Sequence, residues 1–252
     1  MEQYGNGPLQ RKIAFITGAS RGIGKGIALE FAKAGYDLIL NCHKNRELLD
    51  DLIKTLKNTY HIQCYAMIGD ISNPDIVNKM CSEAFAEFGD PDVLINNAGI
   101  AYYGLLNEMS TENWQQVLNT NLSSAFYCSK EVIPSMIKKK RGKIINISSI
   151  WGNCGASYEV AYSVSKGGLN TYTKALAKEL APSNIQVNAI SCGVIDTQMN
   201  EHLSPEERQA LMDEIPACRF GTTKEVGELA LLLAMAPDYL TGQIITMDGG
   251  LL

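Results

Sequence analysis

Tyr162 and Lys166 stand four positions apart, with Ser149 thirteen positions before the tyrosine and Asn121 further upstream. Residues at i and i+4 of a helix project from one face, about one turn apart. An ammonium beside a phenol favours the phenolate, so we expect Lys166 to lower the pKa of Tyr162 toward working pH. A phenol tuned in this way can give a proton to a carbonyl oxygen or take one from an alcohol. A lone pair of this spacing is common on helix surfaces, so this interpretation depends on the other motifs.

A glycine-rich segment, residues 17–24 (TGASRGIG), stands between an expected strand and an expected helix. Glycine lets the backbone approach a pyrophosphate, and the start of a helix offers free N–H groups and the positive end of its dipole. Tight strand-to-helix turns also use glycine for steric reasons alone, but here strand, turn and helix are in register. The segment therefore predicts a dinucleotide site, with contacts from Gly18, Ser20, Arg21, Gly22, Ile23 and Gly24.

Two more segments follow expected strands directly. In residues 96–99 (NNAG), small side chains would let a ribose lie against the chain, and asparagine amides could join neighbouring strands. A purely structural turn is the alternative to cofactor contacts from Asn97, Ala98 and Gly99. Asp70, followed by Ile71, could accept a hydrogen bond from an adenine amino group. It could instead cap the next helix, although Ser72 or Asn73 suits that role better.

The elements that must position these residues alternate between apolar runs of strand length and longer helical patterns. We expect helices near 23–34, after the second strand, and near 74–88, 111–139, 158–181 and 224–236. The expected strands are 12–17, 37–42, 62–68, 92–95, 143–148, 185–190 and 243–247. This alternation predicts an α/β fold: one Rossmann-type, doubly wound sheet of seven mainly parallel strands with helices on both faces. Its ligand crevice would lie at the carboxyl ends of the strands.

A chain of 252 residues with 46% hydrophobic residues can form one sizeable core. We expect a single domain over 11–252 and a flexible tail over 1–10, which has no apolar stretch typical of a secretory signal. The segment 193–222 lacks a strand and carries a short polar helix near 205–212. It is either a mobile lid over the crevice or a plain surface excursion.

Charge and cysteine usage narrow the class of protein. A formal net charge of −5 argues against nucleic acid as a partner, and no apolar run is long enough to span a membrane. The seven cysteines lack metal-ligand spacing and there are only three histidines, so we expect no metal site. Free thiols in a reducing cytoplasm are the favoured interpretation.

Together, these motifs resemble the short-chain dehydrogenase/reductase family, and the match runs from residue 12 to the C-terminus. They include TGASRGIG, the position of Asp70, NNAG, the asparagine of NTNLSS, the second serine of ISSI, YxxxK and a late G-x-I-x-T at 193–197. The resemblance implies a nicotinamide cofactor that delivers hydride to a ketone. It implies that Tyr162 is the acid, that Ser149 binds the carbonyl oxygen, and that Lys166 holds the nicotinamide ribose and tunes the tyrosine. Asn121 would position a water for proton resupply, and Gly193, Ile195 and Thr197 would contact the cofactor.

The end of the second strand bears on the choice of cofactor. NAD-preferring folds of this kind usually place an acid there, but residues 41–44 read Asn-Cys-His-Lys. Lys44, His43 and Arg21 could instead receive a 2′-phosphate. The sequence therefore predicts a preference for NADP(H) over NAD(H).

Two residues depart from the family pattern. Cys192 stands where the family usually has proline, which frees the backbone and could loosen the loop on the cofactor side. An inert thiol is the favoured interpretation of it. Glu159, three residues before Tyr162, is either a helix-dipole partner or a contact for a cationic substrate group. Trp151 is a second candidate for the substrate site.

The general type resembles the 3-oxoacyl-acyl carrier protein reductases, which act in fatty acid biosynthesis and bind the acidic acyl carrier protein. The basic run at 138–141 could dock that partner, or it could be the solvated end of a helix. Ser183 stands at a second docking position that is basic in those reductases, which weakens this interpretation. The segment around Trp151 and Glu159 looks more like the elongation factor P 5-aminopentanone reductases. The resemblance also implies a homotetramer, and a non-catalytic dinucleotide sensor is the alternative from another class.

Overall fold

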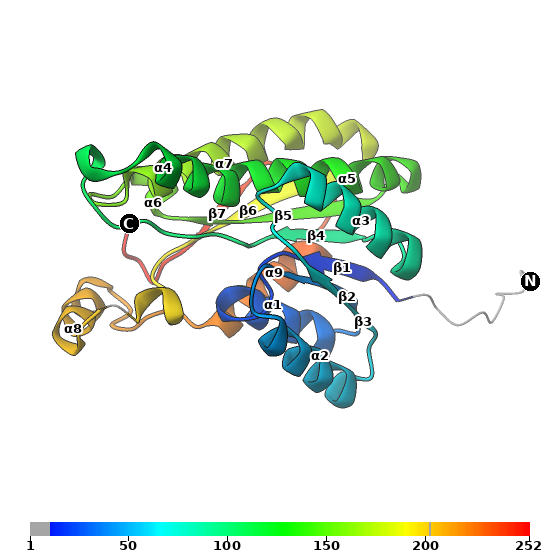
Figure 1. The fold of residues 1–252 in the computed structure, drawn as a ribbon, viewed down its shortest axis with the longest axis horizontal. Helices are drawn as coiled ribbons and strands as arrows, with labels where there is room; N and C mark the ends of the chain where they lie inside the picture. Colours follow the sequence, from blue (N-terminus) through cyan, green and yellow to red (C-terminus); the bar gives the residue numbers. More distant parts are fainter. Residues whose placement is uncertain (1–10, 202) are drawn as a thin grey trace, which may run out of the picture.

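The computed structural model describes residues 11–201 and 203–252, so the predicted tail over residues 1–10 lies outside the described residues. Seven strands form one sheet in the order β3-β2-β1-β4-β5-β6-β7, and every neighbouring pair is parallel (Figure 1). This confirms the predicted fold class. The strands are β1 (Ile13–Ile16), β2 (Asp37–Cys42), β3 (Cys64–Ile68), β4 (Val93–Asn96), β5 (Gly142–Ser149), β6 (Ile185–Cys192) and β7 (Ile244–Met247).

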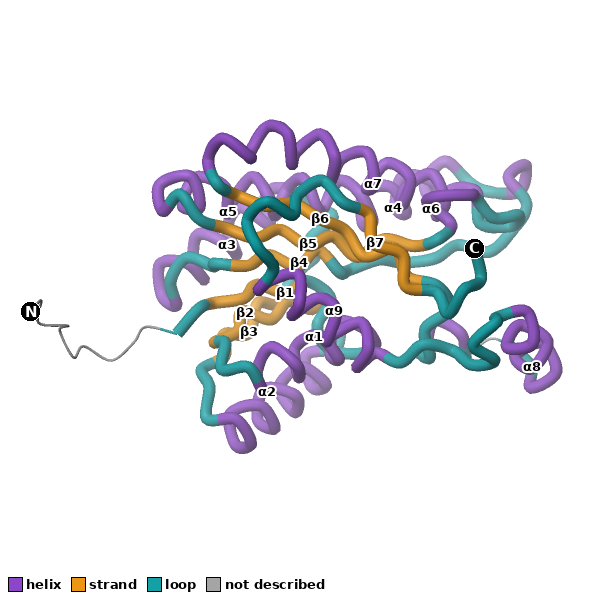
Figure 2. The backbone as a smooth tube through the Cα atoms, turned by 180° about the vertical axis from the view of Figure 1, so that it is seen from behind, coloured by secondary structure: helices purple, strands orange, loops and turns teal. Residues whose placement is uncertain are grey.

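Helices cover both faces of the sheet (Figure 2). One layer contains α1 (Gly22–Lys33), α2 (Arg46–Tyr60) and α9 (Thr223–Met235), and the other contains α3 (Pro74–Phe88), α5 (Ser124–Lys139) and α7 (Val160–Leu180). Near the carboxyl ends of the strands lie α4 (Thr111–Leu118), α6 (Trp151–Cys154) and α8 (Pro205–Glu214). Short 3-10 turns occur at Leu106–Glu108, Ala181–Ser183 and Gln198–Asn200.

The central strands read as unbroken apolar runs because both of their faces are covered. Every residue of β1 and β4 is buried. Phe15 of β1 packs with the α3–α5–α7 layer, whereas its neighbour Ile16 packs with the α1–α2–α9 layer. Successive strand residues point to opposite faces, so one short strand anchors two cores.

The order of the strands reverses between β1 and β4, which lead outward to β2 and to β5 respectively. In an open parallel sheet a ligand crevice forms at such a switch point, outside the carboxyl ends of the strands. The glycine turn follows β1 and the NNAG segment follows β4, so both lie at this point. Beyond the same ends, α8 stands apart from the two layers (Figure 1).

One expected helix is interrupted. The sequence predicts a continuous helix over 111–139, but five residues, Asn119–Ser123, form a π-helical turn between α4 and α5. Within it Asn121 is buried, and its side chain bonds both backbone groups of Ile100 instead of facing solvent. Ser124 also donates its hydroxyl to the carbonyl of Thr120 at 2.6 Å. Such side-chain bonds compete with regular helical geometry, and π-turns are frequent at functional sites. The periodicity of the sequence carries no signal for this extra residue.

Candidate active site

The turn between β1 and α1 can adopt its path only because of its glycines. Gly18 (φ 63°) and Gly22 (φ 55°) lie in the left-handed region. A methyl group at Gly24 would overlap the carbonyl oxygen of Gly18. Arg21 precedes α1 and makes no side-chain cap to it within the described part of the chain. The first N–H groups of α1 therefore remain available, which suits a pyrophosphate. Of the other predicted contacts in the turn, Ser20 is buried and Ile23 packs against the core.

The NNAG segment is hydrogen-bonded to this turn. Asn97 donates its side-chain amide to the carbonyls of Thr17 (2.8 Å) and Gly18 (3.1 Å). In return, the Thr17 hydroxyl oxygen accepts from the backbone N–H groups of Asn97 (3.0 Å) and Ala98 (3.1 Å). These bonds hold the ends of β1 and β4 together, so the expected structural role of the asparagine amide is present. They leave the backbone at the cleft rather than the asparagine side chain to meet a ligand.

The end of β2 carries basic side chains and no carboxylate. His43 and Lys44 are exposed, as is Arg21 in the glycine turn. Burial raises the pKa of Asp70, but hydrogen bonds from Ser72 and the charges of His43 and Lys44 outweigh it, and the pKa falls below its ordinary value. Asp70 therefore lies close to this basic group as a carboxylate, and Ile71 beside it is buried. Asp70 is not the helix cap, because Asn73 caps α3.

Ser149, Tyr162 and Lys166 meet at the ends of β5 and β6. Lys166 is only 4% exposed, and its Nζ lies 5.6 Å from the centroid of the Tyr162 ring. That ammonium donates to the carbonyl of Ile147 at 2.8 Å. Ser149 accepts a hydrogen bond from the N–H of Trp151 at 3.2 Å, and its hydroxyl is also hydrogen-bonded to Tyr162. The three predicted side chains therefore form one contiguous group.

The direction of the tyrosine shift differs from the prediction. Burial raises the pKa of Tyr162 well above its ordinary value, and the hydrogen bond from Ser149 only partly offsets this. Lys166 does not lower it, because its ammonium lies over the ring and is bonded to Ile147 rather than to the phenol oxygen. The expectation of a lowered phenol pKa is therefore wrong. Burial instead lowers the pKa of Lys166 to about 8, which places its titration close to neutrality.

Asn121 lies on the same side of the cleft as the lysine. Its amide nitrogen donates to the carbonyl of Ile100 (2.9 Å) and to the hydroxyl of Ser165 (3.0 Å). A methyl group placed on Gly99 would lie 3.4 Å from Oδ1 of Asn121 and 3.5 Å from Nζ of Lys166. Asn121 and Lys166 therefore flank the backbone at Gly99, the last residue of the NNAG segment.

The segment after β6 closes the site from the far side. Gly193 donates its N–H to Met247 at 2.9 Å, and a side chain there would collide with the backbone of Asp248. Ile195 is buried and forms an isolated parallel bridge with Gly221. Thr197 lies against the glycine turn, since a methyl group on Gly22 would be 3.6 Å from its Cγ2. Two cofactor-side segments about 170 residues apart in sequence are thus in contact.

Residues 12–208 match the family model for short chain dehydrogenases. The chain belongs to this family. The 3-oxoacyl-[acyl-carrier-protein] reductase FabG of Buchnera aphidicola is 42% identical over 245 residues, 96% of this chain and 97% of that protein. The uncharacterized oxidoreductase YmfI of Bacillus subtilis is 36% identical over 240 residues, 95% of this chain and 98% of that protein. A solved structure provisionally assigned as a gluconate dehydrogenase from Agrobacterium tumefaciens has a TM-score of 0.91 and 34% identity, and the match covers 95% of both chains.

A short-chain dehydrogenase is an oxidoreductase that acts on CH–OH or C=O groups, and membership implies a nicotinamide dinucleotide cofactor. The glycine turn fits such a group, because no side chain can be placed at Gly18 or Gly24 without a collision and the first N–H groups of α1 have no side-chain cap from any residue that the structure describes. Among the described residues, no three His, Cys, Asp or Glu side chains are grouped so that they could hold a metal ion. None of the helices placed by the structure combines the length and apolar character needed to cross a membrane.

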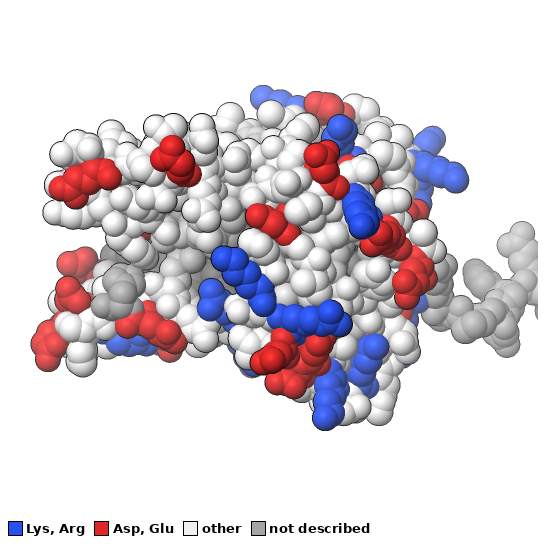
Figure 3. All heavy atoms as spheres, viewed as in Figure 1, with Lys and Arg blue, Asp and Glu red and all other residues white. Residues whose placement is uncertain are grey.

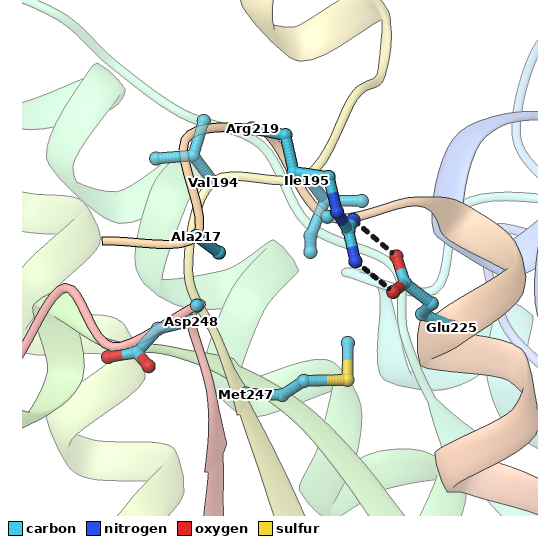
Figure 4. Close-up of a pocket in the computed structure, with 9 residues that line it drawn as sticks. Val194, Ile195, Ala217, Arg219, Glu225, Met247 and Asp248 are labelled. Atoms are coloured by element: carbon cyan, nitrogen blue, oxygen red, sulfur yellow. Dashed lines mark hydrogen bonds and ion pairs between the residues drawn. The ribbon is translucent and has the colours of Figure 1, made fainter. Parts of the chain in front are cut away.

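A cavity of about 240 Å³ lies beside this dehydrogenase's cofactor-side loop (Figure 4). Val194, Ile195 and Met247 line it, and a two-pronged ion pair between Arg219 and Glu225 (2.6 and 3.0 Å) stands at its edge. Tyr162 and Lys166 do not line it. The expected catalytic residues therefore lie outside the lining of this cavity.

On the substrate side, three segments come together. Trp151 begins α6 directly after β5, and Glu159 begins the turn into α7. Burial raises the pKa of Tyr103 to about 12, and the charge of Glu159 contributes to this rise. The same charge also acts on Tyr162. The backbone joins these segments, since Gly104 donates its N–H to the carbonyl of Tyr158 at 2.9 Å.

The sequence analysis did not identify Tyr103. The aromatic pair that follows the NNAG segment is the pattern that could have indicated it. Cys192 was noticed only as a departure from the family pattern. It ends β6 directly opposite Ser149, and burial raises the pKa of its thiol to about 12. The thiol therefore stays protonated, in agreement with the inert interpretation. The loop after it is held by the Gly193–Met247 bond, so the doubt about its stiffness finds no support in the geometry.

Charge divides the cleft of this dehydrogenase into two ends. We expect the substrate end of the cleft among the segments 98–115, 150–165 and 196–219. Their only Lys or Arg residues are Arg208 and Arg219. Both arginines are paired with carboxylates, Asp196 and Glu225 respectively. Figure 3 shows Lys and Arg atoms above α1 and Asp and Glu atoms on the lobes that carry α4 and α8. The acidic residues of these segments are Glu108, Glu112, Glu159, Asp196, Glu201, Glu206, Glu207, Asp213 and Glu214.

Proposed function

We propose that this dehydrogenase reduces a ketone to a secondary alcohol with NADPH, and that Tyr162 is the proton donor. One observation supports the proposal: Ser149 is hydrogen-bonded to Tyr162, and the ring of Tyr162 lies 5.6 Å from Nζ of the buried Lys166. This group lies beside the NNAG segment, which is itself bonded to the glycine turn. A non-catalytic dinucleotide sensor would have no need of this complete set.

The bound cofactor supplies the hydride that reaches the carbonyl carbon. The Ser149 oxygen accepts from the N–H of Trp151. Its hydroxyl hydrogen, which is donated to Tyr162 in the free protein, would be donated to the carbonyl oxygen once a ketone is bound. The raised pKa of Tyr162 keeps its proton in place at neutral pH until negative charge grows on that oxygen. Tyr162 then transfers the proton, which completes the alcohol.

Lys166 would return a proton to the tyrosine and hold the ribose hydroxyls of the cofactor. Its pKa of about 8 allows both the charged and the neutral form near neutrality, as a relay requires. Asn121 would position a water for this relay, since it and Lys166 flank Gly99. Gly193, Ile195 and Thr197 would hold the nicotinamide end and the phosphates.

The preference for NADPH follows from the end of β2. Arg21, His43 and Lys44 are exposed on the rim of the adenosine side and have no carboxylate among them to accept ribose hydroxyls. Asn41 is buried and donates to the carbonyls of Met67 and Gly69. A 2′-phosphate would form charge-assisted hydrogen bonds with the basic group.

For the substrate, we propose first a 3-oxoacyl thioester carried by acyl carrier protein. Relatives bearing that name support it, with identities of 36–42% over most of the chain. Fatty acid biosynthesis would then be the context. The expected docking run is partly engaged, however: Lys139 bonds the carbonyl of Asp90, and Arg141 pairs with Asp92 at 3.1 Å. Ser183, at the second expected docking position, is uncharged.

The acidic substrate end favours a second candidate, a ketone that carries a protonated amine. A 5-aminopentanone group on elongation factor P is such a substrate. Carboxylates combined with aromatic rings are typical of sites for cationic amines. The charge of Glu159 acts on both Tyr162 and Tyr103, and Tyr103 and Tyr158 are 46% and 56% exposed. An acidic carrier protein would be repelled by the same rim.

We also propose a homotetramer in the cytoplasm. Apolar side chains are exposed along α5 and α7, including Phe126 (50%) and Val164 (47%). A second group lies on and after α9, where Leu232, Met235 and Tyr239 are 66%, 67% and 101% exposed. Two such faces would serve two kinds of contact in a closed assembly. Sedimentation as a monomer would contradict this, and the seven unpaired cysteines support a reducing compartment.

NADPH oxidation against a substrate panel tests the function. The panel contains acetoacetyl groups on acyl carrier protein and on a small thiol, neutral ketones, a steroid ketone, an amino ketone and aminopentanone-modified elongation factor P. We expect turnover of at least one ketone, and none with Tyr162→Phe. No turnover with any of them, by a protein that binds NADPH, would overturn the proposal in favour of a sensor.

A further inference from the structure

A chain of hydrogen bonds runs from Asn153, an exposed residue of α6, to buried side chains behind the proposed catalytic group. Asn153 of α6 donates its side-chain amide to the hydroxyl of Ser191 in β6 at 3.0 Å. Its amide oxygen accepts from the side chain of Asn170 in α7 at 2.9 Å. Ser191 is fully buried and Asn170 is 7% exposed. One side chain therefore ties together the three elements that follow or carry the proposed active-site residues.

α6 needs contacts of this kind, because a helix this short is not stable without contacts to the rest of the protein. It has four residues, and its backbone bonds link Asn153 and Cys154 to Ile150 and Gly155 to Trp151. An isolated single turn is unstable in water, since nucleation costs more than so few bonds return. A methyl group on Gly152 would lie only 2.7 Å from the backbone of Lys166, so α6 rests directly on α7.

The partners of Asn153 lie next to the proposed active-site residues, so the loss of the Asn153 side chain would affect the reaction. Asn170 follows Lys166 by one helical turn, and Ser191 immediately precedes Cys192, which is opposite Ser149. The amide oxygen of Asn170 is buried without a hydrogen-bond partner. An unpaired buried acceptor is costly, and an apolar residue at this position would avoid the cost. The amide group of Asn170 offsets this cost by donating its hydrogen bond to Asn153.

We propose that Asn153 is a positioning residue for ketone reduction. Its amide fixes α6 against β6 and α7. The N–H of Trp151 in α6 in turn directs the Ser149 hydroxyl toward Tyr162 and the substrate oxygen. This rests on the proposed function, because it assigns a task within the same site.

Kinetics of Asn153→Ala test this role. We expect kcat to fall about ten- to a hundredfold, because small misplacements of a polarising group have effects of this size. NADPH affinity should stay within about twofold, since α6 makes no contact with the glycine turn in the contacts described above. In alcohol oxidation, the pH at which the rate rises should move upward, because the hydrogen bond that lowers the pKa of Tyr162 is lost. Asn153→Asp keeps the acceptor for Asn170, and the Ser191 hydroxyl can turn to donate to the second carboxylate oxygen, so this variant should recover most of kcat.

A second readout does not depend on activity. The chain has two tryptophans, so Trp114→Phe leaves Trp151 of α6 as the only one. In that background, Asn153→Ala should increase the mobility of Trp151, seen as lower fluorescence anisotropy and stronger quenching by acrylamide. Asn78→Ala is the matched control, because Asn78 is exposed and its side chain bonds the carboxylate of Glu131, away from the proposed active site.

Unchanged kcat, pH profile and Trp151 mobility in Asn153→Ala would overturn the proposal. If that variant does not fold, Ser191→Ala removes one of the two contacts, and an unchanged pH profile and Trp151 mobility in it would overturn the proposal equally. Failure of the proposed function is recognised separately, as wild-type protein that turns over no ketone of the panel while the Trp151 measurement still responds.

Discussion

The two ends of the cleft are built from different parts of the protein. The cofactor end consists of backbone: the glycine turn, the start of α1, and carbonyls held by the Asn97 amide. Basic side chains only fringe it. The substrate end consists of side chains from three segments that lie far apart in the sequence, and it is acidic and aromatic. Figure 3 shows more Asp and Glu than Lys and Arg atoms on the lobes that carry α4 and α8, and a group of Lys and Arg atoms near α1.

This contrast separates two kinds of constraint. Backbone contacts depend on glycine and on helix geometry, so few substitutions are compatible with the cofactor end. Side chains at an exposed rim can change without disturbing the core, so the substrate end can be altered with little cost in stability. The proposed catalytic group lies between the two ends, on β5 and α7. Substitutions at each place should therefore produce different kinetic signatures.

The largest effect on kcat is expected for the proposed catalytic group, which lies between the two ends of the cleft. Tyr162→Phe removes the proton donor and keeps the ring, so kcat should fall by about a hundred- to ten-thousandfold. NADPH binding, measured by nicotinamide fluorescence, should be unchanged. Tyr239→Phe, at a fully exposed position, is the control. Turnover that survives in Tyr162→Phe would mean that another group donates the proton.

A smaller effect is expected at the cofactor end. Arg21→Ala combined with Lys44→Ala removes charge-assisted bonds to a 2′-phosphate, so the KM for NADPH should rise about ten- to a hundredfold. The KM for NADH should barely change, because NADH lacks that phosphate. Lys25→Ala on the exposed face of α1 is the control. Equal losses with both cofactors would show that these residues act through the fold.

Next comes the substrate end. Glu159→Gln removes a rim charge, so kcat/KM for an amino ketone should fall about fivefold relative to a neutral ketone of the same length. Because the charge of Glu159 raises the pKa of Tyr162, the variant should also shift the pH profile of alcohol oxidation downward. Glu112→Gln is the control at the same end. Equal effects on both ketones would remove the argument for a cationic substrate.

The smallest effect concerns the stability of the fold at the end of the segment 193–222. Hydrogen bonds from Arg219 and Thr222 lower the pKa of Glu225 to about 2 from its ordinary 4.5. A carboxyl with a lowered pKa stabilises the fold above its ordinary pKa, and this contribution disappears as the pH falls toward about 2. Urea unfolding should therefore show a modest deficit for Glu225→Gln at neutral pH that narrows in acid. A deficit that is independent of pH would point to packing instead.

Much of this architecture could be predicted from local pattern. Apolar runs of strand length, helical periodicity and the residues of the glycine turn predicted seven parallel strands with helices on both faces, and these predictions were confirmed. The turn is predictable because its conformation depends on its own glycines, Gly18 and Gly22, and on the elements directly beside it. The helix cap at Asn73 was predictable for the same reason.

Other features depended on contacts between distant parts of the chain. The interruption of the helix at Asn121 follows from bonds to Ile100, which lies 21 residues away. The bond from Asn153 to Ser191 joins residues 38 positions apart, and the sequence pattern around either residue does not predict it. Helical periodicity describes neighbours within one element and carries no information about such partners.

The pKa of Tyr162 shows the limit most clearly. The i, i+4 spacing placed Lys166 near its ring, but burial decided the direction of the shift, and the lysine made its bond with Ile147 instead. The amino-acid sequence therefore determined which chemical groups are present and which helices, strands and turns carry them. Desolvation and the meeting of three remote segments at the substrate end arise only when the chain is packed, because both depend on which surfaces exclude water together.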